Sequence, residues 1–237
     1  MDSQDGACAA LERYRLHTVH ETGRELGRGS YAAVVEVKYK GLRCAGKKIH
    51  RILYEGQVDN LVRRFEEECR LLSQLSHPHI VQFLGIYLDV DNNTPVMVME
   101  FLPITLTQCL DRYGVMPKEI YYSILQDVIL GLRYLHERDN PIIHRDLSAN
   151  NVLLTPDMRA KISDLGVAKI LQVNPIRQQT MSKTPGTSCY MPPEVMTDRP
   201  RYNLKVRSVH DLRLYNICAC QGVHYRLCSM YIFSLTS

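Results

Sequence analysis

The sequence has no tryptophan, no long apolar run and no Cys-x-x-Cys pair among its eight cysteines. No segment approaches the roughly 18 apolar residues that a membrane span needs, and residues 1–20 lack the apolar core of a secretory signal. Cys218-Ala-Cys220 has no second pair to complete a zinc site. These absences predict a cytoplasmic protein with reduced thiols and no membrane span.

A strong charge of either sign is also missing. The 29 lysines and arginines and 25 aspartates and glutamates leave a net charge of +4, too small to indicate a nucleic-acid partner. The 237 residues, 45% of them hydrophobic, suffice for a real core but are long for one domain and short for two. The sequence leaves the oligomeric state open.

The hydrophobic periodicity changes near Pro103. Before it, alternating segments surround one helical stretch, Val58–Leu75, which His77-Pro78 ends. The strands expected there are at 25–26, 34–39, 42–49, 80–88 and 95–101. After Pro103 we expect helices at 106–113 and 118–138, short strands at 152–154 and 160–163, and a polar surface segment at 171–185.

The loop at 143–151 carries residues suited to catalysis. Asp146 can accept a proton from an attacking hydroxyl, and the amide oxygen of Asn151 can hold a divalent metal. A second acid, Asp164, comes thirteen residues after Asn151, which leaves room for one short hairpin.

A glycine-containing stretch at 27–34 lies between two expected strands. Gly27 and Gly29 would let backbone amides approach phosphate oxygens closely. Taken alone, the same stretch is typical of a tight hairpin turn.

Together, residues 22–194 resemble a eukaryotic protein kinase catalytic domain, with the motifs in the family's order. The loop around Asp146 is similar to His-Arg-Asp-Leu-x-x-x-Asn. Residues 27–34 are similar to Gly-x-Gly-x-x-Gly-x-Val, with Ala32 as the third glycine, and residues 44–47 stand where the family has Val-Ala-Ile-Lys. The resemblance implies a two-lobed α+β fold, with a small antiparallel sheet and one main helix, then a mainly helical large lobe.

In the small lobe, the resemblance assigns Lys47 to the α- and β-phosphates of ATP, with Glu68 as its partner on the helix. Lys48 should point to the opposite face of its strand. Glu66 and Glu67 are expected to be solvated, as charged runs on helices usually are.

Three residues at the end of the last expected strand resemble the adenine pocket. Met99 resembles the gate of the back pocket, and Glu100 and Leu102 resemble the hinge; read alone, they are an ordinary strand end. The other ATP contacts that the resemblance implies are Leu26, Gly27, Gly29, Val34, Ala45 and Leu153.

In the large lobe, the resemblance makes Asp146 the catalytic base, and Asn151 and Asp164 the ligands of Mg²⁺. His144 resembles a structural histidine that packs under Asp164; without that context it could equally ligate a metal. Arg145 resembles the arginine that receives a phosphate from the activation segment.

The signals for substrate specificity are mixed. Ser148 stands where Ser/Thr kinases typically carry lysine, but residues 186–194 resemble their Gly-Thr-x-x-Tyr-x-Ala-Pro-Glu motif, with Thr187 bridging to Asp146. Tyrosine kinases usually have Lys-Trp there, and this chain has no tryptophan. We predict a tyrosine-kinase-like member that phosphorylates Ser/Thr, with Tyr as the alternative. Candidate phosphosites facing Arg145 are Thr180, Ser182 and Thr184; the alternative is an unmodified polar loop.

From Arg207 onward the family pattern is lost. We therefore predict a lead-in at 1–20, a small lobe at 21–102, the front part of a large lobe at 103–206, and a divergent tail at 207–237. The helices lost with the pattern should leave one side of the apolar stripe from Ile120 to Leu135 uncovered.

Two functions follow from these residues. The first is a signalling protein kinase that uses ATP and Mg²⁺ on a protein substrate, with activity impaired by truncation. The second is a catalytically inactive binding module with the same fold. An unrelated nucleotide-binding fold ranks third, because the chain has no Gly-x-x-x-x-Gly-Lys-Ser/Thr loop.

Overall fold

The computed structural model describes residues 12–29, 32–50, 58–89, 94–114, 116–166 and 168–170. It divides into two compact units, Met1–Leu102 and Pro103–Ser237, each described by itself below. The predicted surface segment at 171–185 and tail at 207–237 lie outside the described residues.

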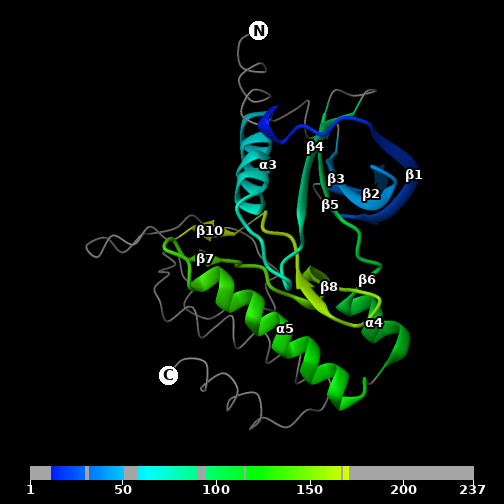
Figure 1. Ribbon diagram of the computed structural model, residues 1–237, viewed down its shortest axis with the longest axis vertical. Helices are drawn as coiled ribbons and strands as arrows, with labels where there is room; N and C mark the ends of the chain where they lie inside the picture. Colours follow the sequence, from blue (N-terminus) through cyan, green and yellow to red (C-terminus); the bar gives the residue numbers. More distant parts are fainter. Residues whose placement is uncertain are drawn as a thin grey trace. The chain divides into compact units, whose positions relative to one another are not determined.

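The first unit is built on a five-stranded antiparallel sheet in the order β1-β2-β3-β5-β4 (Figure 1). Its strands are β1 (Val19–Arg28), β2 (Ala32–Tyr39), β3 (Leu42–Ile49), β4 (Phe83–Leu88) and β5 (Pro95–Glu100). Lys40 and Gly41 join β2 to β3, and both have positive φ, at 49° and 79°. A two-residue turn of this kind matches the right-handed twist of the strands that it connects.

The two faces of this sheet have different surroundings. One face packs into a core cluster of Val37, Cys44, Tyr87, Val96 and Val98. Gly46 belongs to this face, where a Cβ atom would lie 3.0 Å from Val37 and 3.1 Å from Val96. Strand alternation turns Ala45 and Lys47 to the other face, which is the face that Glu68 reaches from the helix.

Helix α3 (Val58–Leu72) ends three residues earlier than the periodicity predicts. Its continuation tightens into a narrower turn, because Leu75 N–H donates to the Leu72 carbonyl at 3.1 Å. Phe65, Leu72 and Leu75 are nevertheless buried, as an inner helical stripe requires. Strand β4 likewise starts at Phe83 rather than at Ile80, which forms only an isolated bridge.

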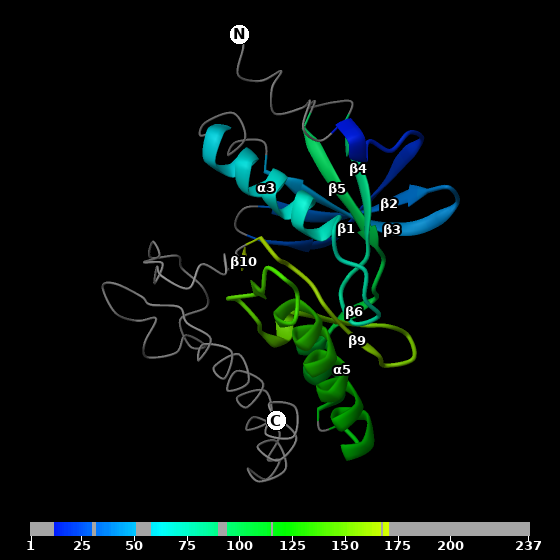
Figure 2. The same cartoon turned by 60° about the vertical axis from the view of Figure 1, so that its left-hand side comes forward.

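In the described part of the second unit, residues 103–170 with two single-residue gaps, two helices accompany short strand pairs (Figure 2). The helices are α4 (Leu106–Tyr113) and α5 (Lys118–His136). The short elements are β6 (Ile104–Thr105), β7 (Ile142–Ile143), η2 (Ala149–Asn151), β8 (Val152–Leu154), β9 (Ala160–Ile162) and β10 (Lys169–Ile170). Strands β6, β8 and β9 form one sheet, and β7 pairs with β10. Thr105 starts α4 with a reciprocal capping box that Gln108 completes.

The apolar stripe of α5 is covered, which corrects the expectation that one side of it is exposed. The buried members are Ile124, Leu125, Val128, Leu132 and Leu135, each 8% exposed or less. Ile120, nearer the start of the helix, is half-buried. The helix ends at His136, two residues before the predicted end.

The predicted fold class is therefore confirmed: the described residues give a small antiparallel sheet with helix α3 in the first unit, and helices in the second. Of the described helices, none is both long and apolar enough to span a bilayer.

Candidate functional site

Lys47 and Glu68 form the ion pair that the sequence predicts. The Lys47 Nζ atom lies 2.8 Å and 2.9 Å from the two carboxylate oxygens of Glu68, so the contact is bidentate. Lys47 comes from the middle of β3, opposite Val34 on β2 and Met97 on β5, while Glu68 comes from α3. The Glu68 side chain is 6% exposed and that of Lys47 is 19% exposed. The pair therefore holds one lysine ammonium in a fixed, largely desolvated position.

Lys48 points to the opposite face, as predicted. Its ammonium pairs with Asp89 and lies 3.5 Å from Glu21. This pairing ties Lys48 into the side of the sheet away from Lys47, so Lys47 alone faces Glu68.

The expectation that Glu66 and Glu67 are both solvated is wrong for Glu66. Glu67 is exposed, but one carboxylate oxygen of Glu66 is buried and has no hydrogen-bond partner among the described residues. Burial raises the pKa of Glu66, while the charge of Arg63 partly opposes the rise. A charged run on a helix does not reveal which member the tertiary structure covers.

The glycine stretch forms the hairpin between β1 and β2. Gly27 pairs with Val34, and the Gly29 N–H donates to the carbonyl of Ala32 at 2.8 Å. The hairpin turn that the stretch suggests when read alone is therefore present, and the role of its glycines at phosphate stays a prediction. His50, which the sequence did not single out, places its Nε2 atom 2.8 Å from the Gly29 carbonyl.

The predicted adenine contacts of the first unit lie on the face that carries Lys47. Ala45 pairs with Met99, and Val34 pairs with Lys47. Antiparallel partners point to the same face, so Val34, Ala45 and Met99 share a half-buried surface. Leu26 is also half-buried.

The residues that resemble the hinge are fixed from two sides. Glu100 N–H donates to the Gln82 carbonyl at 3.0 Å, and the Glu100 carboxylate accepts from Gln82 N–H at 2.7 Å. The Arg43 guanidinium stacks on the ring of Phe101, 3.7 Å from its centroid. Leu102 follows and is half-buried. The contact of Arg43 with Phe101 was not predicted, because Arg43 lies in β3 and Phe101 follows the end of β5, and no local pattern links them.

In the second unit, His144 is fully buried and bonds through both ring nitrogens. Its Nε2 atom lies 2.8 Å from the Ser163 carbonyl, and its Nδ1 atom accepts the N–H of Asp146 at 3.3 Å. Both bonds form only if the ring is neutral with its proton on Nε2. The described structure therefore favours the packing role of His144 over metal ligation.

Asp146 and Asn151 are brought together by the 3₁₀ turn η2. The Asn151 amide nitrogen donates to the Asp146 carbonyl at 2.7 Å and lies 3.3 Å from its Oδ2 atom. The Asn151 carbonyl in turn accepts the N–H and hydroxyl of Ser163, at 2.8 Å and 3.1 Å. Ser163 immediately precedes Asp164, so one set of bonds positions all three predicted polar residues.

The backbone is unusual at two of these positions. Arg145 and Asp164 have φ of 67° and 58°, a left-handed conformation that is uncommon away from glycine. Residues with this conformation cluster at functional sites, where contacts with the surrounding structure hold the strained backbone in place. Here the bonds of His144 and Asn151 flank both residues.

The donor set fits a hard divalent cation. The Asn151 amide nitrogen is engaged by Asp146, which turns its oxygen away from that bond, and Asp164 is exposed. Among the described residues, no three His, Cys, Asp or Glu side chains group as a self-sufficient metal site. Magnesium needs no such cage, because it is usually held by one or two carboxylates together with substrate phosphates and water.

A buried carboxylate that sequence reasoning missed supports this region. Asp127 of α5 is 1% exposed and accepts two bonds from the Arg159 guanidinium, at 2.8 Å and 2.6 Å. It also accepts the Ala160 N–H at 2.9 Å, at the start of β9. An aspartate in the middle of an apolar helical stripe was the available signal.

The remaining predicted residues are placed only in part. Leu153 lies half-buried in β8. The predicted regulatory residues Thr180, Ser182, Thr184 and Thr187 lie outside the described residues, as does the 186–194 motif.

Comparison with known sequences agrees with these motifs. The protein kinase domain model matches residues 20–207. The chain belongs to the protein kinase family. The matched range ends at Arg207, where the family pattern is lost in the sequence.

Several protein kinases are similar to this chain. The serine/threonine-protein kinase TNNI3K of Rattus norvegicus is 32% identical over 194 residues, which cover 81% of this chain and 22% of the relative. Serine/threonine-protein kinase 12 of Arabidopsis thaliana is 35% identical, over 73% of this chain and 36% of the relative. Mitogen-activated protein kinase kinase kinase 19 of Mus musculus is 33% identical, over 74% of this chain and 14% of the relative. The chain thus spans well under half the length of these relatives.

Proposed function

We propose that this kinase-family chain binds Mg²⁺-ATP and transfers the γ-phosphate to a protein hydroxyl. The observation that carries the proposal is the bidentate Lys47–Glu68 pair, with oxygen-to-nitrogen distances of 2.8 Å and 2.9 Å. A lysine on this strand, paired to a helix glutamate, must be in place for protein kinases to act.

The proposed mechanism relies on positioning and charge neutralisation, because phosphoryl transfer requires little covalent work from the protein. Lys47, held by Glu68, contacts the α- and β-phosphates. Asp146 accepts the proton of the substrate hydroxyl and orients its oxygen. Asn151 and Asp164 would hold Mg²⁺, which supplies charge neutralisation at the phosphate oxygens. The adenine ring is bound against Val34, Ala45 and Met99, with Leu26, Gly27, Gly29, Glu100, Leu102 and Leu153 as the further contacts.

Serine and threonine are the proposed acceptors. Two of the relatives named above are serine/threonine-protein kinases by name. The resemblance of residues 186–194 to the Ser/Thr-kinase motif, which includes Thr187, supports the same specificity, as does the absence of tryptophan. A tyrosine acceptor remains the alternative outcome of the substrate test.

We also propose that a phosphate on Thr180, Ser182 or Thr184 is received by Arg145. The left-handed backbone of Arg145, φ 67°, fixes where its side chain leaves the catalytic loop. A phosphate carries three acceptor oxygens and about two negative charges, which an arginine fork can bind. The cytoplasm is the proposed location, and the buried free thiols of Cys44, Cys69 and Cys109 agree with a reducing compartment.

Radiolabel transfer from ATP to serine-, threonine- and tyrosine-containing protein substrates tests this function. The substitution Asp146→Asn should lower the rate of phosphate transfer by about 10²–10⁴-fold, the usual contribution of a general base. Mg²⁺-ATP should still raise the melting temperature of this variant. An Asp146→Asn protein that keeps full transfer would contradict the role of Asp146. A wild-type chain without transfer, but with a nucleotide-induced thermal shift, would favour the binding-module function.

A further inference from the structure

A short segment before the matched kinase domain is built into the first unit. It consists of residues 12–16, here called the N-terminal strap, and includes the 3₁₀ turn η1 (Glu12–Tyr14). The match to the family begins only at residue 20. The deep-blue η1 turn contacts β4, beside which it lies in Figure 2.

The strap adds to the free edge of the sheet. Strand β4 is the last in the order β1-β2-β3-β5-β4, so none of the other strands that the structure describes pairs with its outer edge. The Leu16 N–H donates to the Ile86 carbonyl at 2.6 Å, and Arg15 bridges Ile86 in parallel orientation. The Leu16 side chain packs against the core cluster of the sheet. Main-chain bonds to an edge strand are a general way to dock an extended segment.

Gly85 of β4 is shaped for this contact. A Cβ atom at Gly85 would lie 2.6 Å from the Leu16 side chain and 2.6 Å from the Tyr14 carbonyl. Gly85 also has a φ of 152°, which residues with side chains rarely adopt. The sheet therefore provides a notch that only a glycine leaves open, and the strap fills it.

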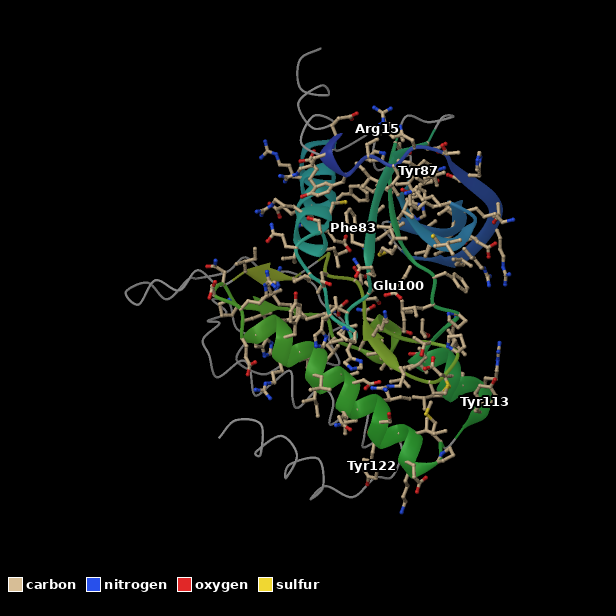
Figure 3. The ribbon with its side chains drawn as sticks, in the orientation of Figure 1. Arg15, Phe83, Tyr87, Glu100, Tyr113 and Tyr122 are labelled. Atoms are coloured by element: carbon tan, nitrogen blue, oxygen red, sulfur yellow. The ribbon has the colours of Figure 1, made fainter. Side chains whose placement is uncertain are left out.

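Tyr14 links the strap to helix α3. Its ring meets Phe83, the first residue of β4, edge-on, with centroids 5.6 Å apart and planes at 88° (Figure 3). Its hydroxyl shares a hydrogen bond of 2.9 Å with the Ser73 hydroxyl, just after α3. The Ser73 N–H in turn donates to the carbonyl of Cys69 at 2.9 Å. Cys69 is the residue next to Glu68, so two hydrogen bonds separate Tyr14 from the backbone beside Glu68.

We propose that the strap holds the C-terminal turns of α3 in position, so that Tyr14 and Leu16 are positioning residues for Glu68 and its pair with Lys47. This inference rests on the proposed function for its effect on nucleotide binding. The effect on α3 itself requires no nucleotide.

A double-mutant cycle on the full-length chain tests the strap through Glu68. Tyr14→Ala should weaken binding of a non-hydrolysable ATP analogue by about 2- to 13-fold, the range for an edge-to-face aromatic contact. The same change in a Glu68→Gln background should have no further effect, because the contact acts through the carboxylate that is already lost. Tyr14→Phe keeps the ring contact with Phe83 but loses the bond to Ser73, so it should recover only part of the affinity.

The matched control is Val19→Ala, which trims another side chain that packs on the same core cluster but lies outside the strap. It should lower the melting temperature without changing nucleotide affinity. If Tyr14→Ala weakens binding equally in both backgrounds, or no more than Val19→Ala does, the strap is only a stabilising segment and the proposal fails.

Hydrogen exchange separates failure of the strap from failure of the proposed function. Without nucleotide, Tyr14→Ala and Leu16→Ala should speed exchange of amides in the last turns of α3 relative to the amides of β2 and β3. A wild-type chain that binds no ATP analogue would contradict the proposed function but leave this readout intact. Unchanged exchange in α3 would overturn the strap proposal.

Discussion

The imidazole of His144 bonds to the Ser163 carbonyl across 2.8 Å, and Ser163 directly precedes Asp164. The same ring accepts the N–H of Asp146 at 3.3 Å. One buried side chain therefore connects the residue proposed as catalytic base with the residue proposed as metal ligand. The positions of Asp146 and Asp164 in the second unit are set by this connection rather than by either residue alone.

His144→Phe tests that connection. The substitution retains a ring of similar size but leaves the Ser163 carbonyl and the Asp146 N–H without their buried partner. Each unsatisfied buried group costs about 1–3 kcal/mol, so the free energy of unfolding should fall by about that amount or more. The apparent affinity for Mg²⁺ in the presence of ATP should fall as well. Urea unfolding and a magnesium titration measure the two effects.

A His144→Phe protein that is destabilised but binds Mg²⁺-ATP normally would show that the histidine only fills space. A matched control is Ile143→Val, a neighbouring fully buried position where one methyl group is removed. It should cost stability of about 0.5–1.5 kcal/mol without a change in the magnesium titration.

The Asp127–Arg159 pair gives a second prediction. Arg159→Ala removes the guanidinium from the buried Asp127 carboxylate, which still accepts the Ala160 N–H. Hydrogen bonds to charged groups contribute about 1.5–3 kcal/mol, and the Arg159 side chain is 52% exposed, so we expect a loss of about 1–2 kcal/mol. Arg159→Lys keeps the charge but loses the bidentate contact. Its free energy of unfolding should lie between those of wild type and Arg159→Ala. Equal free energies of unfolding in urea for wild type, Arg159→Ala and Arg159→Lys would contradict a stabilising role of the Asp127–Arg159 pair.

Glu66 gives a prediction about pH. Burial raises its pKa in the folded chain above the ordinary value, so folding favours the protonated carboxyl. That contribution is fully present below the unfolded pKa and is lost as pH rises through the raised folded pKa. Glu66→Gln should therefore be more stable than wild type at pH 7, with the advantage shrinking toward pH 4. Glu67→Gln, at the exposed neighbour, should show no such trend in unfolding free energy.

The pairs that the sequence predicts are those that short motifs and strand alternation specify. Lys47 rather than Lys48 faces Glu68 because neighbouring residues of a strand point to opposite faces. Likewise, Asp146 and Asn151 meet because both lie within one loop of nine residues, 143–151.

What escaped prediction depends on contacts between distant segments. Asp127 and Arg159 are 32 residues apart, and Tyr14 and Ser73 are 59 apart, so no local pattern links them. The burial of Glu66 beside exposed Glu67 depends on what covers one side of α3 rather than on helix periodicity. The early end of α3 depends on the tighter turn at 73–75, which its apolar spacing does not reveal.

The central claim is that Lys47 and Asp164 act on one molecule of Mg²⁺-ATP. Calorimetric titration with a non-hydrolysable ATP analogue, with and without Mg²⁺, tests it most directly in wild type, Lys47→Met and Asp164→Asn. We predict that wild type binds more tightly with Mg²⁺, that Asp164→Asn abolishes this gain but keeps the metal-free affinity, and that Lys47→Met weakens binding in both conditions. Binding that is indifferent to both substitutions, or a magnesium gain that survives Asp164→Asn, would contradict the account.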